Sequence, residues 1–331
     1  MRDGGQNDGN SDYDAVIVGA SLAGCATAIA LGRAGARVAL TEKRPDPAAF
    51  KRTCSHFIQA SAVPALERLD LLEPMLAAGA LRTPMRAWTR WGWIQAPAER
   101  AREGVNLRRE VLDPQWAAAF PTDSGLTFYA AMPTKDRLPE FRRDPEAALV
   151  SFLAEIPEAP PIEVSKRVGP VLGKIEMPNR VSQPVAPGLA LVGDAAMAVD
   201  PLFGVGCGWA LQSAEWLSES VAPALVGGEP LDAGLARYRR RHRRQLRGHA
   251  AMINEYATGR RQNRGERILF AGAARSPSVA TTFDAFGTRC IGPGRALASM
   301  MPRALVVNAR HALGRRKSGA AADAPLHPAA R

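Results

Sequence analysis

The chain has 331 residues, of which 46% are hydrophobic and 23% charged, a composition ordinary for a globular protein with a buried core. It contains no uninterrupted apolar stretch long enough to cross a bilayer, and its polar, acidic start (MRDGGQNDGNSD) lacks the features of a secretory signal. Four scattered cysteines without paired spacing are typical of reduced thiols. These features exclude a membrane-spanning or disulfide-stapled protein and predict a cytoplasmic location.

The net charge of +11 is concentrated near the C-terminus, where residues 231–331 hold 20 lysines and arginines against 5 aspartates and glutamates. Its densest run is RYRRRHRRQLRGH, residues 237–249. The leading interpretation of such a run is a solvated helix face, and the alternative is a surface that attracts phosphates, anionic lipid or nucleic acid. Nucleic acid is disfavoured, because the run lacks interleaved aromatics and no nucleic-acid module is recognisable.

The first elements predict one βαβ unit. Residues 1–12 are rich in glycine, asparagine and aspartate and are expected to be disordered. The apolar run at 13–19 (YDAVIVG) predicts a buried parallel strand, residues 22–34 a helix, and residues 36–42 (ARVALTE) a second buried strand. The crossover between such strands is right-handed in nearly all proteins.

The later elements alternate between helical and β patterns. The predicted helices cover residues 61–78, 137–156, 205–225 and 235–256, the last of them amphipathic. The predicted β elements are the aromatic stretch at 85–94, a hairpin at 116–134 around Asp123-Ser124-Gly125, and a short buried strand at 188–193 (GLALVG). The Ala/Pro-rich tail at 319–331 is expected to be disordered.

The stretch DAVIVGASLAG is similar to a nucleotide-binding G-x-G-x-x-G turn whose middle glycine is serine. Gly19 permits the bend, Gly24 allows helix and strand to pack closely, and the Ser21 hydroxyl can donate to a phosphate. Phosphate oxygens would meet the N–H groups at the helix start. Glu42, at the end of the second strand, can accept hydrogen bonds from adenosine ribose hydroxyls and would repel a 2′-phosphate. A generic βαβ turn with a surface glutamate is the alternative.

A second motif, GLALVGDAAMAVDPLFGVGCGWALQSAEWL, spans residues 188–217. Asp194 follows the predicted strand and could accept from a ribityl hydroxyl. Gly204, Gly206 and Gly208 would let main-chain N–H groups approach a planar ring or its phosphate. The following helix N-terminus would stabilise negative charge on a reduced ring. A glycine-rich turn between strand and helix is the alternative.

In this order, the two motifs resemble the FAD-dependent monooxygenase and reductase superfamily, which includes para-hydroxybenzoate hydroxylase-like enzymes, geranylgeranyl reductases and flavin-dependent halogenases. The resemblance implies an α/β fold: a Rossmann-like FAD-binding βαβ domain, a reduced substrate-side β-sheet and a helical C-terminal region. It implies an FAD-binding domain at residues 13–114 and 188–228, a shortened substrate-side region at 115–187 and a basic helical region at 229–318. The FAD contacts implied are Gly19, Ala20, Ser21, Gly24, Glu42, Lys43, Arg109 (with Arg108 as its alternative in NLRREVLDP), Gly193, Asp194, Pro201, Gly204, Val205 and Gly206.

The chain departs from this family after Asp113-Pro114. Members carry a long section there, with an Ala-Asp-Gly motif that contacts FAD and the nicotinamide donor, whereas this sequence leads directly into the hairpin and has no such motif before Gly188. A missing central strand predicts neighbouring strands with exposed edges and unpaired backbone groups. A variant that binds FAD weakly, or a remnant without turnover, is the resulting hypothesis.

The leading functional hypothesis is an FAD-dependent oxidoreductase. FAD would be reduced by NAD(P)H and would then hydroxylate, epoxidise or reduce an apolar small molecule. Trp88, Trp91 and Trp93 would either pack or line the pocket, and the basic run favours peripheral contact with an anionic membrane. No catalytic residue is identified, and Cys54-Ser55-His56 predicts an ordinary turn rather than a metal site. The alternative is a non-catalytic, degenerate Rossmann protein whose basic arm binds a partner or nucleic acid.

Overall fold

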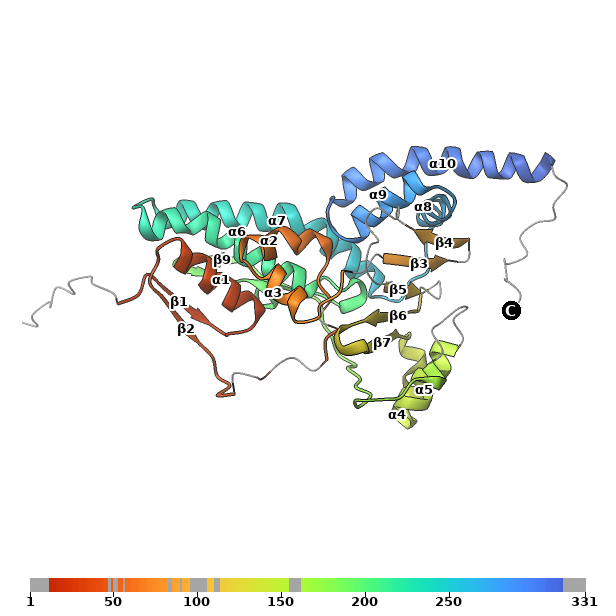
Figure 1. The fold of residues 1–331 in the computed structure, drawn as a ribbon. Helices are drawn as coiled ribbons and strands as arrows, with labels where there is room; N and C mark the ends of the chain where they lie inside the picture. Colours follow the sequence, from red (N-terminus) through yellow and green to blue (C-terminus); the bar gives the residue numbers. More distant parts are fainter. Residues whose placement is uncertain are drawn as a thin grey trace, which may run out of the picture.

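The computed structural model describes residues 12–46, 49, 53–55, 57–82, 85–89, 91–95, 106–109, 114–154 and 162–317. The predicted disordered ends lie, apart from residue 12, outside these residues. Figure 1 shows two parts side by side: the two-stranded sheet β1–β2 with helices α1, α6 and α7, and a five-stranded sheet between α8–α10 and α4–α5. No described helix is long and apolar enough to span a membrane.

The predicted βαβ unit is confirmed at the N-terminus. It consists of β1 (Ala15–Val18), α1 (Leu22–Arg33) and β2 (Val38–Thr41). The strands pair in parallel, with Ala15 opposite Val38 and Val18 opposite Thr41. Gly35, at φ 96°, ends the helical segment in the left-handed conformation that glycine adopts most readily.

The prediction that both strands are buried is wrong. Val16 is 65% and Val18 87% exposed, and Leu40 of β2 is 40% exposed. Among the described residues β1 pairs with β2 alone, so its other edge carries no strand. One face packs on helices, where Ala15 and Ile17 contact the core, while the face of Val16 and Val18 stays open. This agrees with the expected consequence of a missing central strand.

The predicted buried strand at residues 188–193 is also wrong. Only β10 (Leu189–Ala190) forms, paired antiparallel with β9 (Val185–Ala186). Leu189 is 54% exposed. Among the described residues β10 has one paired neighbour, and the strand is only two residues long. Nearby, β8 (Arg180–Val181) pairs antiparallel with β11 (Met197–Ala198).

A mixed five-stranded sheet has the order β4-β3-β5-β6-β7, with only β3 and β5 parallel. The predicted hairpin is confirmed, with Ser124 and Gly125 both at positive φ in its turn. Because β5 pairs with β6, the expected domain boundary at residue 114 falls inside this sheet. The strands are β3 (Met85–Thr89), β4 (Gly92–Gln95), β5 (Asn106–Arg109), β6 (Trp116–Pro121) and β7 (Thr127–Met132).

Helices cover both ends of this sheet (Figure 1). Phe152 and Leu153 pack against Ala117 of β6, and Ile94 of β4 packs into a cluster with Phe270. Trp91 packs beside that cluster, which confirms the packing alternative for this tryptophan. The side chains of Trp88 and Trp93 lie outside the described part of the chain. The helices are α4 (Leu138–Arg143) and α5 (Pro145–Ala154) at one end, and α8 (Arg264–Arg275), α9 (Pro277–Gly287) and α10 (Pro293–Lys317) at the other.

The core beside β1–β2 is built on α6 (Gly206–Val226), which packs against α1, α2 (Val63–Arg68) and α7 (Leu231–Tyr256). A short helix, α3 (Leu72–Ala77), follows α2. The predicted amphipathic helix at 235–256 is confirmed within α7. Its buried face carries Leu235, Tyr238, His242, Leu246, His249 and Ile253.

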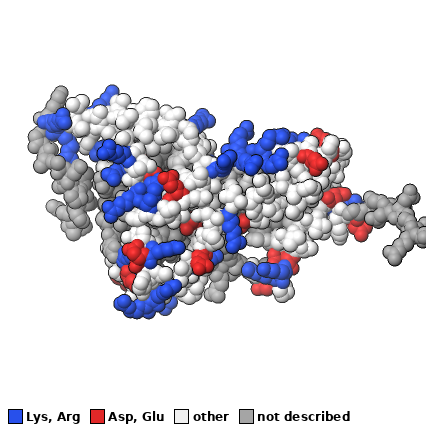
Figure 2. All heavy atoms as spheres, turned by 180° about the vertical axis from the view of Figure 1, so that it is seen from behind, with Lys and Arg blue, Asp and Glu red and all other residues white. Residues whose placement is uncertain are grey.

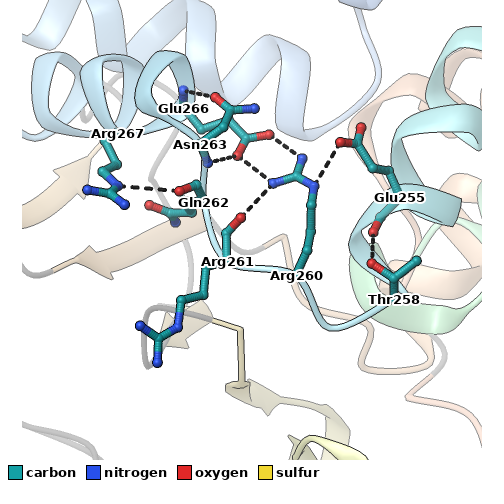
Figure 3. Close-up of polar contacts among 8 residues, drawn as sticks. All are labelled: Glu255, Thr258, Arg260, Arg261, Gln262, Asn263, Glu266 and Arg267. Carbon is teal, nitrogen blue, oxygen red and sulfur yellow. Dashed lines mark hydrogen bonds and ion pairs between the residues drawn. The ribbon is translucent and has the colours of Figure 1, made fainter.

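Polar contacts fix the junction between α7 and α8 (Figure 3). Arg260 donates to both carboxylate oxygens of Glu266, at 2.8 and 2.6 Å, and forms an ion pair with Glu255 at 2.8 Å. Asn263 and Glu266 form a capping box at the start of α8. Burial opposes ionisation of Glu266, but hydrogen bonds from Arg260 and the Asn263 N–H lower its pKa overall. The junction therefore connects the two parts of the molecule through a charged network.

Candidate cofactor site

The first turn is shaped by two glycines. Gly19, at φ 100°, donates its N–H to the Thr41 carbonyl at 2.7 Å. A Cβ on Gly24 would lie 1.8 Å from the Gly19 carbonyl oxygen, so no larger residue fits there. Ser21 directly precedes α1, and its side chain does not cap the helix. The result is a backbone cradle at a helix N-terminus, the geometry that binds phosphates in nucleotide-binding folds.

Glu42 lies against this turn, as the sequence predicts. Its carboxylate accepts from the Arg44 N–H at 3.0 Å and from the Ala20 N–H at 2.8 Å. These two backbone hydrogen bonds, that of Arg44 first, lower the pKa of Glu42. The group is therefore ionised at neutral pH and remains exposed beside Lys43. An ionised carboxylate at this position can accept hydrogen bonds from ribose hydroxyls.

The second motif docks directly on the first. A Cβ on Gly193 would lie 2.9 Å from the Ala23 Cβ in α1. The Gly193 N–H donates to the buried Ser213 hydroxyl of α6 at 2.9 Å. Asp194 lies in a 3-10 turn, Gly193–Ala195, rather than at the tip of a long strand. Even so, Asp194 and Ser21 line the same cavity.

The glycine-rich loop after Asp194 is held by hydrogen bonds within the loop and to Asn179. Asp200 accepts from the Leu202 N–H at 3.0 Å, and the Asp200 N–H donates to the Asn179 side-chain oxygen at 2.7 Å. Burial raises the pKa of Asp200, partly opposed by the Leu202 hydrogen bond. A Cβ placed on Gly204, which has a φ of 61°, would lie 3.1 Å from the Phe57 ring. The loop thereby presents the N-terminus of α6 to the cavity.

One large cavity, about 2740 Å³, joins both motifs to the β6–β7 hairpin. Small-molecule sites typically enclose roughly 300–1,000 Å³, so this volume allows for a dinucleotide together with a second ligand. On the hairpin side it is lined by Phe120, Phe128, Tyr129 and Met132. On the motif side it is lined by Gly19, Ser21, Gly24, Asp194, Pro201, Gly204 and Gly206.

The other predicted residues support these lining residues or lie apart from them. Val205 is buried behind the loop, 1% exposed. Arg109 is the last residue of β5, opposite Ala117, and its contact with the cofactor stays a prediction. Sequence reasoning missed Ser213 and Gln59, whose side-chain amide donates to the Phe203 carbonyl. Both act across long sequence separations, and no local pattern marks either one.

The comparisons agree with this geometry. Residues 12–124 match the FAD binding domain family. The flavin-dependent brominase Bmp2 has a similar structure (TM-score 0.64, 16% identity, 92% of this chain and 100% of that chain). The p-nitrophenol 4-monooxygenase PnpA from Pseudomonas putida DLL-E4 is also similar (TM-score 0.63, 16% identity, 84% of this chain and 98% of that chain). The same holds for the myxobacterial chondrochloren halogenase CndH (TM-score 0.60, 16% identity, 86% of this chain and 98% of that chain). No curated protein matches the sequence.

Residues 12–124 therefore form a domain of the FAD-binding family, and the chain as a whole has the fold seen in these flavin-dependent enzymes. The protein is a flavoprotein oxidoreductase, and its cofactor is FAD. The residues present fit that cofactor, because Gly19 has a positive φ, a Cβ on Gly24 would collide with the Gly19 carbonyl oxygen, and both glycines line the cavity.

Proposed function

We propose that this oxidoreductase takes electrons from NAD(P)H and hydroxylates, epoxidises or reduces an apolar small molecule. The observation that carries the proposal is the single cavity that joins the cofactor loops to the apolar hairpin β6–β7. FAD, when bound, supplies the hydride or oxygen chemistry. The protein supplies binding, orientation and electrostatics.

Two helix N-termini border the cavity and have separate tasks in this proposal. The start of α1, with Ser21, would hold the pyrophosphate through its N–H groups. The start of α6, with Gly206, would stabilise negative charge on the reduced ring. Glu42 would hold the adenosine ribose, and Asp194 the ribityl chain, across the contact between Gly193 and Ala23.

The hairpin supplies the apolar side of the cavity. The Phe57 and Phe120 rings lie 5.5 Å apart, and those of Phe120 and Phe128 6.4 Å. Together with Met132 they form a surface that would bind an apolar substrate and displace water from the reacting centre. This aromatic row is the part of the cavity expected to determine which molecules bind.

The test is an absorption spectrum of the purified protein, followed by anaerobic addition of NADH or NADPH. The expected results are a yellow protein with flavin bands and bleaching of those bands by one or both donors. A colourless protein whose melting temperature FAD does not raise would instead support the non-catalytic alternative. A yellow protein that neither donor bleaches would contradict the NAD(P)H step alone.

We also propose that α7 contacts an anionic membrane surface. Arg237 and Arg241 are paired with Glu229 and Glu219. Figure 2 shows basic side chains gathered over this part of the molecule. Those exposed along α7 are Arg239, Arg240, Arg243, Arg244 and Arg247. Basic residues near an anionic leaflet each contribute about 1 kcal/mol, and salt screens the attraction.

Vesicle co-sedimentation tests this surface. The protein should sediment with phosphatidylglycerol vesicles at low salt and remain in solution with phosphatidylcholine vesicles. Arg243→Glu/Arg244→Glu should abolish sedimentation, whereas Arg142→Glu/Arg143→Glu, an equal charge change on exposed residues of α4, should leave it intact. Equal loss in both variants, or no sedimentation of the parent protein at low salt, would remove the proposal.

A further inference from the structure

Two cysteines from distant parts of the chain meet at the wall of the cofactor cavity. The Cys54 and Cys207 sulfur atoms lie 3.9 Å apart, and both residues are half-buried and line the cavity. Cys207 is in the first turn of α6, between Gly206 and Gly208. Cys54 belongs to the segment that precedes the packed residues Phe57 and Gln59.

The cysteine pair lies beside a seam of contacts between residues 57–62 and residues 203–212. Gln59 donates to the Phe203 carbonyl, and Gln212 donates to the Ser61 carbonyl at 2.9 Å. A Cβ on Gly204 would lie 3.1 Å from the Phe57 ring. The seam therefore holds the two sulfur atoms in contact, and a bond length of about 2 Å requires a shift of about 2 Å.

We propose that Cys54 and Cys207 are a dithiol–disulfide pair that hydrogen peroxide oxidises within the cofactor cavity. The N-terminal turn of α6 favours the thiolate of Cys207. That thiolate attacks peroxide: an S–O bond forms, the O–O bond breaks and hydroxide leaves. The Cys54 sulfur then attacks the sulfenic acid: an S–S bond forms, the S–O bond breaks and the oxygen leaves as water after taking up the thiol proton.

Overall, two thiols and one peroxide give one disulfide and two waters, so the sulfur atoms lose two electrons and the peroxide gains them. The bond would tie residues 54 and 207 across the seam that borders the cavity. Oxidation should therefore raise the melting temperature, because it closes a long loop in the unfolded chain. The inference does not depend on turnover, because peroxide supplied in solution is sufficient.

The experiment treats the full-length protein, with and without added FAD, with excess hydrogen peroxide, followed by catalase, denaturation, alkylation and mass spectrometry. The reduced protein should take four alkyl groups, one for each cysteine. The oxidised monomer should take two, lose about 2 Da for its two thiol hydrogens, and yield one cross-linked peptide containing residues 54 and 207. A reductant should restore all four sites.

Cys54→Ser and Cys207→Ser should each abolish the cross-link, whereas Cys25→Ser and Cys290→Ser should retain it. Cys25 in α1 and the exposed Cys290 serve as matched controls, because neither lines the cavity. The proposal is overturned if the peroxide-treated protein still takes four alkyl groups, if the bond joins other cysteines, or if it forms only between two chains. The flavin spectrum plays no part in this readout, so failure here is distinct from failure of the proposed activity.

Discussion

The β1–β2 sheet and the five-stranded sheet both contain apolar strands, yet these strands lie in opposite environments. In the five-stranded sheet, Ile94 is 3% exposed and Ala117 is fully buried, because helices pack on both strands. In the two-stranded sheet, Val16 and Val18 are largely exposed although their sequence is as apolar. The burial of a strand therefore depends on the elements that pack on its faces, which the apolar run alone does not specify.

The open face of β1 has a functional side. Val16 and Val18 both line the cavity that contains the cofactor cradle. The opposite face, with Ala15 and Ile17, packs on the core around α6 and α7, and these two residues also border the cavity. Strand β1 thus borders the cavity while its Ala15 and Ile17 side chains support the core. At β4, by contrast, the five-stranded sheet is mainly structural, because Ile94 packs into a helical cluster. The predictions below test this division, starting with the largest expected effect.

Gly24→Ala should abolish FAD binding, with Kd rising at least about 100-fold, because the new Cβ would lie 1.8 Å from the Gly19 carbonyl oxygen and distort the cradle. Gly32→Ala is the matched control in the same helix, since no atom lies within 4 Å of its Cβ position. It should retain FAD and gain up to about 1 kcal/mol from helix propensity. Flavin fluorescence titration measures both, with circular dichroism as a check on folding. Similar Kd values for the two variants would contradict the assignment.

Phe152→Ala should lower the free energy of unfolding by about 3–5 kcal/mol, because the ring is 1% exposed and packs on the five-stranded sheet. Val18→Thr in the other sheet should change it by less than about 0.5 kcal/mol in the absence of FAD, since the side chain is 87% exposed. Urea denaturation gives both values. A large loss in Val18→Thr would mean that the open face is covered in solution.

Acid should destabilise the α6–α7 core. Burial lowers the pKa of His242 and of His249 to about 4, the latter also through the charge of Arg289. Between pH 6.5 and 4 the unfolded chain binds more protons at these sites, so stability falls as pH decreases through this window, by on the order of 2 kcal/mol per histidine. His242→Phe should lose less stability between pH 7.5 and 4.5 than the parent, measured by urea denaturation. His311→Gln, at an exposed site, should match the parent.

Arg260→Ala should cost about 1–3 kcal/mol, because it leaves the partly buried Glu266 without its charged partner at the junction of the two parts. Glu73→Ala removes the exposed Arg82–Glu73 pair and should cost less than about 0.5 kcal/mol. Thermal unfolding should also show whether the β1–β2 part and the five-stranded sheet still unfold together in Arg260→Ala. An equal cost for both variants would argue against a structural junction.

Local patterns predicted the elements that depend on local physics. The turn at Gly19, helix α1 and the proximity of Glu42 follow from glycine geometry and the βαβ arrangement. The strand at residues 188–193 was predicted wrongly, because the length and burial of a strand depend on the segments that pair with it and pack on it. A local apolar run does not specify those segments. The cradle contact between Gly193 and Ala23, and the support from Ser213, depend on distant segments meeting, which no local spacing encodes.

The contact between Gly193 and Ala23 also orders events during synthesis. The ribosome releases α1 long before α6, yet the cradle gains its second wall only when the glycine on one side meets the alanine on the other. Closing so long a loop is slow compared with forming a helix. The nascent chain would therefore bind its flavin only after α6 has emerged from the ribosome. Until then, the apolar face of the N-terminal βαβ segment would stay uncovered.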